Sequence, residues 1–301
     1  MGCSTRLLSI IVVSLLILFV VGVALGAIGA KFTGMDPLAP KPAIHLPPQP
    51  VFPPQEKPEP MRFAITNTLL GSWVTTACLL LLFYFVFRRA KLVPGRLQGM
   101  LEAIVEFLLN MTEGAIGKER ARRIFPLVLT IFLFVLFNAV LAILPIYGPI
   151  GYKDAHGAIA IPLLRNASTD INLPLAMALV VVVTVEYWGV RAVGALRYGG
   201  QFLNVRQLLK GRPMGVIDLF VGGLEALSHL IRVVSFTFRL FGNMTAGKSL
   251  LLIVAFLAPF LAAVPIYGLE LLLGLVQALI FAGLTMVFAA VAVLPHDEGT
   301  H

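Results

Sequence analysis

The chain has 301 residues, of which 58% are hydrophobic and only 13% are charged. A soluble domain is typically about 45–50% apolar and about 25% charged, so this composition excludes a water-soluble fold and a disordered chain. The net charge of +8 leaves too few charges to coat a nucleic-acid-binding surface. The two cysteines provide neither a disulfide framework nor a metal cluster. The composition is that of an integral membrane protein.

Six hydrophobic segments reach the length of about 20 residues that is needed to cross a hydrocarbon core of about 30 Å. They lack the two-residue alternation of barrel strands, so we expect helices. The predicted fold class is an all-α integral membrane protein with five core membrane helices and an N-terminal hydrophobic segment. The last two helices are expected to be long and strongly tilted. The six segments are 7–28, 65–87, 125–147, 173–190, 214–258 and 266–294.

The N-terminal sixty residues differ in composition from the rest of the chain. Arg6 precedes an apolar segment that ends in Gly-Ala-Ile-Gly-Ala, which fits a signal peptide and an uncleaved anchor equally well. Residues 36–60 then contain ten prolines, which predict an extended, polyproline-like linker and exclude a helix or a central strand. We therefore divide the chain into a signal or anchor (1–30), an external linker (31–62) and a membrane domain (63–301).

The distribution of Lys and Arg predicts the orientation in the membrane. The 88–123 loop carries eight of these residues and the 191–213 loop carries five, whereas the 148–172 loop carries two. The first two loops are therefore predicted to be cytoplasmic, and the third loop and the proline-rich linker to be outside. Between Arg96 and Arg123 apolar residues recur at helical spacing, which predicts an amphipathic helix near the inner membrane surface.

The fifth segment is too long for an upright span. No proline lies between Pro213 and Pro259, and a continuous helix of that length would measure about 68 Å. Such a helix must tilt strongly or break, because the hydrocarbon core is less than half as thick. Tilting favours a helix that lies along another object in the membrane. The alternative is two short helices joined by a re-entrant break near Gly242.

Polar residues in the last two segments are the candidate functional residues, because charges within membrane spans are costly and usually functional. Their spacings of 4, 3, 7 and 4 place five of them on one face of the fifth helix, which predicts an ion path. Lys248 lies further along the same segment, and the sixth segment carries an acid and an amide seven residues apart. The five are Glu225, His229, Arg232, Arg239 and Asn243, and the other two are Glu270 and Gln277.

Arg239 has the most specific chemistry of the set. An arginine cannot be deprotonated in a protein, so it is a poor proton carrier and a permanent electrostatic barrier. A carboxylate that approaches it is driven to its ionised form. Glutamate and histidine side chains can instead relay protons.

The string Ser-Phe-Thr-Phe-Arg-Leu-Phe-Gly-Asn-Met-Thr-Ala-Gly at 235–247 resembles subunit a of F-type ATP synthases. The Arg-Leu-Phe-Gly-Asn core is highly specific to that family. Gln-Ala-Leu-Ile-Phe at 277–281 matches the family's last helix, and Glu225 lies fourteen residues before the arginine, as the family pattern requires. Asp-Ile-Asn at 170–172 also fits. The resemblance covers about residues 61–296.

The resemblance implies roles for these residues. Arg239 would face the rotating ring of c subunits, with Asn243 and Gln277 as polar partners beside it. Glu225 would belong to the half-channel on the cytoplasmic side, and Glu270 would line the half-channel open to the outside.

Two further positions need their own interpretation. Many bacterial relatives have an acid at the position of Lys248 and a histidine at that of Glu270. We therefore hypothesise a Lys248–Glu270 contact that preserves the opposite charges. His229 is either part of the channel, which we favour, or a satisfied buried histidine.

The implied function is that of a proton-translocating stator subunit of the rotary ATP synthase membrane sector. It would be non-catalytic, would need no cofactor or metal, and would not bind nucleic acid. Its partners would be the c-subunit ring, b-type peripheral stalk subunits, the soluble ATPase head and the lipid bilayer. The implied location is the bacterial inner membrane, with several spans. The alternative is a secondary ion-coupled transporter in which Arg239 holds a substrate anion, but the sequence shows no inverted repeat of the kind that such transporters contain.

Overall fold

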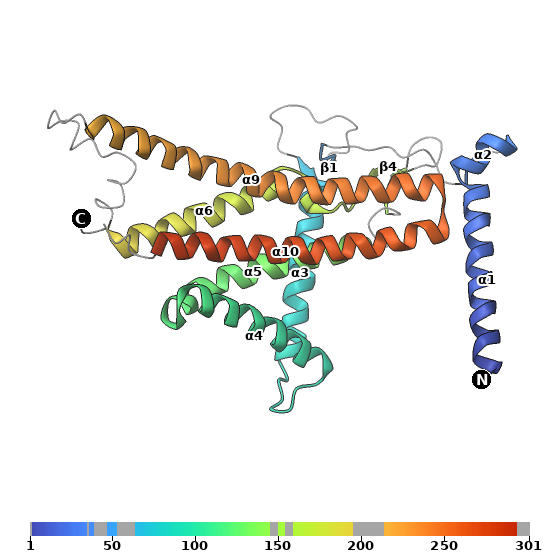
Figure 1. Cartoon of the computed structure of the whole chain (residues 1–301), viewed down its shortest axis with the longest axis horizontal. Helices are drawn as coiled ribbons and strands as arrows, with labels where there is room; N and C mark the ends of the chain where they lie inside the picture. The colour runs from blue at the N-terminus through green and yellow to red at the C-terminus, as the bar shows by residue number, and fades with distance from the viewer. Residues whose placement is uncertain are drawn as a thin grey trace. The chain divides into compact units, whose positions relative to one another are not determined.

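The computed structural model describes residues 2–34, 36–38, 47–52, 64–144, 150–153, 159–194 and 214–293. Helices dominate these residues, which confirms the predicted all-α class (Figure 1). The helices are α1 (Gly2–Leu25), α2 (Ala27–Thr33), α3 (Asn67–Phe87), α4 (Arg96–Ile116), α5 (Lys118–Ile143), α6 (Asn172–Val193), α9 (Met214–Leu257) and α10 (Ala263–Val293), with short 3₁₀ turns η1 (Ala167–Thr169) and η2 (Phe260–Ala262).

Within the described residues, six helices are long and apolar enough to cross a membrane. They are α1, α3, α5, α6, α9 and α10, and each coincides with one of the predicted hydrophobic segments. The six predicted spans are therefore confirmed by length and composition.

Two short antiparallel sheets accompany the helices. Strand β1 (Pro50–Phe52) pairs with β2 (Ile65–Thr66), and β3 (Gly151–Lys153) pairs with β4 (Ile159–Pro162). The first sheet contains part of the proline-rich linker, which is extended there. The sequence excluded a central strand from this linker. A sheet of two strands has only edge strands, so Pro50 in β1 agrees with that expectation. Most of the linker lies outside the described residues.

The boundary between α4 and α5 differs from the sequence-based expectation. The amphipathic helix expected between Arg96 and Arg123 is present, but it ends at Ile116. Gly117 follows with a φ of 84°, a conformation that side chains with a Cβ rarely adopt, so the glycine allows the chain to turn there. The basic residues after it open α5, which therefore begins at Lys118 rather than at the expected residue 125 and contains Pro126.

Helix α9 is continuous from Met214 to Leu257, a length of 44 residues. It passes through Gly242 without interruption, so the alternative of a re-entrant break at that glycine is wrong. The helix ends just before Pro259, whose ring is incompatible with a helical residue before it. Phe260 has a φ of 69° at the start of η2, and α10 begins three residues later.

Residue contacts divide the chain into two compact units, which we describe separately. The first unit consists of residues 1–71, 139–169 and 242–275, and the second consists of residues 72–138, 170–241 and 276–301. Both α9 and α10 contribute to each unit.

In the first unit, α1 lies against the turn that joins α9 to α10 (Figure 1). Two glycines one helical turn apart form this contact. A Cβ atom added to Gly22 would lie 2.3 Å from the carbonyl oxygen of Pro259, and one added to Gly26 would lie 2.1 Å from that of Leu257. Neither position can hold a side chain without a shift of the backbone. The pair thus permits a close helix approach of the kind that small residues allow in membranes.

In the second unit, aromatic rings join α9 to α10. Phe236 is 2% exposed, and its ring packs edge-to-face on Phe281 at 4.6 Å between centroids and on Phe288 at 5.4 Å. Polar bonds tie further helices together. The Thr75 hydroxyl of α3 donates to the Asn138 amide oxygen of α5 over 3.4 Å. The aromatic contacts hold α9 beside α10 in the second unit, and the Thr75–Asn138 bond holds α3 beside α5.

Candidate functional site

Helices α9 and α10 carry the predicted site residues, divided between the two units. The second unit contains Glu225, His229, Arg239 and Gln277, and the first unit contains Asn243, Lys248 and Glu270. Because α9 is one unbroken helix, its polar residues keep the spacings that the sequence predicted, and Asn243 follows Arg239 by about one helical turn.

In the second unit, His229 is paired with an acid on a neighbouring helix. Its Nδ1 atom lies 2.5 Å from Oε1 of Glu186, which belongs to α6. The side chains of His229 and Glu186 are 21% and 27% exposed, respectively. Glu186 was not among the predicted site residues. It is the only charged residue in segment 173–190, and that isolated charge was a signal that could have identified it.

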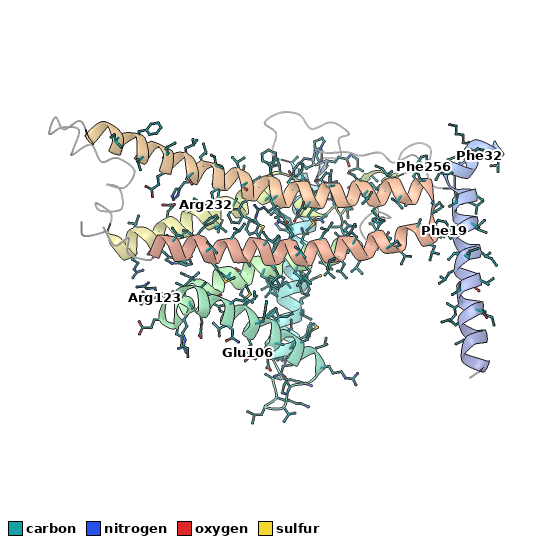
Figure 2. All side chains as sticks on the ribbon, in the orientation of Figure 1. Phe19, Phe32, Glu106, Arg123, Arg232 and Phe256 are labelled. Atoms are coloured by element: carbon teal, nitrogen blue, oxygen red, sulfur yellow. The ribbon has the colours of Figure 1, made fainter. Side chains whose placement is uncertain are left out.

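Two other polar side chains lie near His229 on α9. Glu225, one helical turn before it, is half-buried. Arg232, three residues after it, places its guanidinium 3.9 Å from the ring centroid of Phe288 on α10 (Arg232 is labelled in Figure 2). Cation–π contacts of this kind contribute about 0.5–2 kcal/mol. The aromatic contact therefore gives the charge of Arg232 a local partner.

Arg239 is half-buried, and it lies within the apolar span of α9 from Phe220 to Leu257. The next residue, Leu240, is fully buried. No hydrogen bond or ion pair joins the Arg239 guanidinium to another residue in the described part of the chain. Gln277, on α10, is 1% exposed.

In the first unit, Glu270 is enclosed by α9. Its side chain is 7% exposed, and a Cβ added to Gly247 of α9 would lie 3.6 Å from its Cγ atom. Its Oε2 atom is buried and has no hydrogen-bond partner among the described residues. The glycine gives the carboxylate the room that a larger residue would occupy.

Lys248 and Glu270 influence each other electrostatically but are not joined by an ion pair in the described structure. The hypothesis of a direct contact between them is therefore wrong, although the opposite charges lie within reach of each other's field. A second cation, Arg165, also influences the charge of Lys248.

Arg165 was not among the predicted site residues. It is 7% exposed, its Nε donates to the Thr169 hydroxyl over 3.0 Å, and its Nη1 donates to the Pro47 carbonyl oxygen over 3.0 Å. A Cβ on Gly71 would lie 2.1 Å from the Arg165 carbonyl oxygen. Sequence reasoning assigned this arginine to an external loop, and no spacing pattern connects it with Lys248.

The charged side chains of the candidate site are of two kinds. Four of them can take up and release a proton: Glu186, Glu225, His229 and Glu270. The arginines stay charged. Asn243 is exposed on α9. Within the described residues, no three His, Cys, Asp or Glu side chains are grouped so that they could hold a metal ion.

Comparison with known proteins gives a consistent result. Residues 69–290 match the family model described as ATP synthase A chain. The "ATP synthase subunit a" of Campylobacter concisus is 34% identical over 223 residues, which cover 73% of this chain and 87% of the relative. That of Campylobacter fetus subsp. fetus is 34% identical over 212 residues, which cover 70% of this chain and 83% of the relative. That of a Nitratiruptor species is 30% identical over 211 residues, which cover 70% of this chain and 82% of the relative.

Proposed function

Because the chain belongs to the ATP synthase A chain family, we propose that it is the proton-translocating stator subunit of a rotary ATP synthase. Family membership places the protein in the membrane sector of that complex, and the six apolar helices among the described residues make it a multi-pass membrane protein. In the proposed role it catalyses no covalent step. It couples proton flow to rotation of a ring of c subunits.

Arg239 is the observation that carries the proposal. Its permanent charge lies inside a 38-residue apolar span, where an isolated cation is expensive unless it has a task. A protonated, neutral ring carboxylate can turn through lipid. When that carboxylate reaches the field of Arg239, its ionised form is favoured and it releases its proton. The same charge blocks direct leakage of protons past it.

The other polar residues are proposed to line the two half-channels. Protons from outside reach the ring carboxylate past Glu270, in the region influenced by Lys248. On the cytoplasmic side they leave past Glu225 and His229. Each charge that crosses a potential of 100 mV supplies about 2.3 kcal/mol, so several protons are needed for each ATP, which a ring provides.

Asn243 and Gln277 are proposed as the polar partners of Arg239. Asn243 follows it by four residues on α9, and the buried Gln277 stands on α10. An amide can donate to a ring carboxylate and accept from a guanidinium, so neither residue needs to change its charge as the ring passes.

The surroundings of the subunit follow from the same proposal. Residues 63–301 form the membrane domain, 31–62 an external linker and 1–30 a signal or anchor. The subunit binds the c ring and b-type stalk subunits in a bacterial inner membrane, and it acts on the soluble ATPase head through the complex. The family assignment favours this role over a secondary transporter.

Replacement of Arg239 tests the proposal. In membrane vesicles that contain the Arg239→Ala complex, ATP synthesis driven by an imposed proton gradient should be abolished. Arg191→Ala is the matched control, because Arg191 is an exposed arginine at the end of α6, and this variant should synthesise ATP at the normal rate. Substantial proton-driven synthesis by the assembled Arg239→Ala complex would refute the assignment.

A further inference from the structure

We propose that Glu186 and His229 together form a two-group proton relay in the cytoplasmic half-channel. This inference rests on the proposed function and extends it to Glu186, an acid on α6. It assigns one step of proton movement to a defined pair of atoms.

The geometry of the pair carries the proposal. The His229 Nδ1 and Glu186 Oε1 atoms are 2.5 Å apart and form an ion-pair contact. Oε1 accepts no hydrogen bond from the described residues in this arrangement, so the imidazole ring must rotate to align an N–H with Oε1 before a proton passes directly between them. The two residues come from different helices, and both lie within candidate membrane spans. Each side chain is more than two-thirds buried, yet neither is fully closed off, so one end of the pair can exchange protons with water.

The neighbouring charged groups on α6 and α9 differ in whether they can exchange a proton. On α9, Glu225 lies one turn before His229 and can act as the next acceptor or donor. Arg232, three residues after it, lies over the Phe288 ring and carries a permanent charge, so it takes no part in the transfer. On α6, Arg191 donates to the Tyr187 hydroxyl over 3.2 Å. Of these neighbouring charged side chains on α6 and α9, Glu225 is the carboxylate that can exchange a proton with the pair.

The transfer balances in three steps. A proton that arrives on the Nε2 atom of His229 forms an N–H bond and makes the ring an imidazolium. The Nδ1–H bond then breaks as an O–H bond forms on Oε1 of Glu186, which leaves a neutral imidazole and a neutral carboxyl group. The carboxyl group releases its proton to channel water, and exchange with water returns the imidazole to its starting tautomer. One proton enters and one leaves in each cycle.

A merely structural pair makes a different prediction from a relay. Glutamine at position 186 keeps an amide oxygen that can accept a hydrogen bond from His229, but it cannot take up a proton. Glu186→Gln therefore preserves the contact between α6 and α9 and removes the transfer. Glu186→Asp keeps a proton-exchanging group and should retain part of the transport.

The experiment uses the whole complex in membrane vesicles and measures both assembly and ATP-driven proton pumping. We expect Glu186→Gln to assemble normally and to pump on the order of tenfold more slowly or worse, with Glu186→Asp in between. Tyr187→Phe, at the adjacent and 56% exposed position, should match the unaltered protein. Normal pumping by Glu186→Gln would overturn the relay.

A second variant covers the case in which Glu186→Gln does not assemble. Exchange of the two residues, Glu186→His with His229→Glu, retains both groups and should restore assembly and pumping together. Assembly without pumping would overturn the relay, and so would failure of every variant to assemble, because the pair would then be structural.

Arg239→Ala distinguishes failure of the relay from failure of the proposed function. If it abolishes synthesis while Glu186→Gln pumps normally, only the relay fails; if it leaves synthesis intact, the proposed function itself fails.

Discussion

The two units hold their membrane charges in different ways. In the second unit, Glu186 and His229 are in direct contact, and Arg232 lies on an aromatic ring. In the first unit, Lys248 and Glu270 interact only through their fields, and Arg165 adds a second positive charge. A pair in direct contact is lost when either partner atom is removed. For charges that act at a distance, the field depends on the net charge of the whole group. The first region should therefore be sensitive to total charge and the second to particular contacts.

The largest effect is expected from reversing the charge of Lys248. Lys248, Arg165 and Glu270 together carry two positive charges and one negative, a net of +1, and Lys248→Glu changes this to −1. We expect proton-driven ATP synthesis to fall by roughly tenfold or more, because fields in a low-dielectric site are weakly screened. The rate is measured in membrane vesicles, with Lys31→Glu, an exposed position of the first unit, as the control.

Reversal of both charges sharpens this prediction. Lys248→Glu combined with Glu270→Lys returns the net charge to +1 and should partly restore synthesis. If the double variant is no better than Lys248→Glu alone, the sum of the charges is not what matters, and the contrast between the two units is lost.

An intermediate effect is expected where α1 meets the α9–α10 turn. Gly26→Leu forces a side chain into the Leu257 carbonyl, so α1 must leave the turn or the turn must move. The purified complex should lose thermal stability, measured as the temperature at which the subunit aggregates. Gly114→Leu, at a helical glycine with open space around its Cβ position, is the control.

The same contact makes a prediction about the N-terminus. If α1 is part of the mature fold, the intact mass of the purified subunit should include residues 1–30. A mass that lacks them, together with an unchanged stability of Gly26→Leu, would show that α1 is a removed signal.

The smallest effect is expected from Phe288→Leu in the second unit. The change keeps an apolar side chain but removes the cation–π contact with Arg232 and the edge-to-face contact with Phe236. We expect a loss of stability of about 1–2 kcal/mol, measured by thermal unfolding. Phe107→Leu, at a position 51% exposed, is the control and should change little. Equal losses in the two variants would show that the ring of Phe288 gives Arg232 no special support.

The fold could be predicted largely because its signals are local. Apolar runs of about 20 residues identify spans, and the absence of proline from 214 to 258 correctly indicated a single long helix. The start of α5 was missed because six residues after Gly117 are mostly charged and read as loop, although they form the helix's first turns.

The candidate site could be predicted only along each helix. A period of 3.6 residues places Glu225 and His229 on one face of α9, but it says nothing about which residue of another helix lies opposite. The partner of His229 on α6 and the effect of Arg165 on Lys248 depend on packing between distant segments. The incorrect expectation of a direct Lys248–Glu270 contact has the same origin.

The length of α9 also determines the direction in which its charges are spread. Its apolar part, 38 residues from Phe220 to Leu257, is about 57 Å long, so it must tilt strongly to lie within a hydrocarbon core of about 30 Å. Glu225 and Lys248 are 23 residues apart. They are about 35 Å apart along the helix axis, and a strong tilt directs much of that separation into the membrane plane. In the proposed function, this helix would separate the two ends of the proton's path largely within the membrane plane, and movement in that plane is what a turning ring supplies.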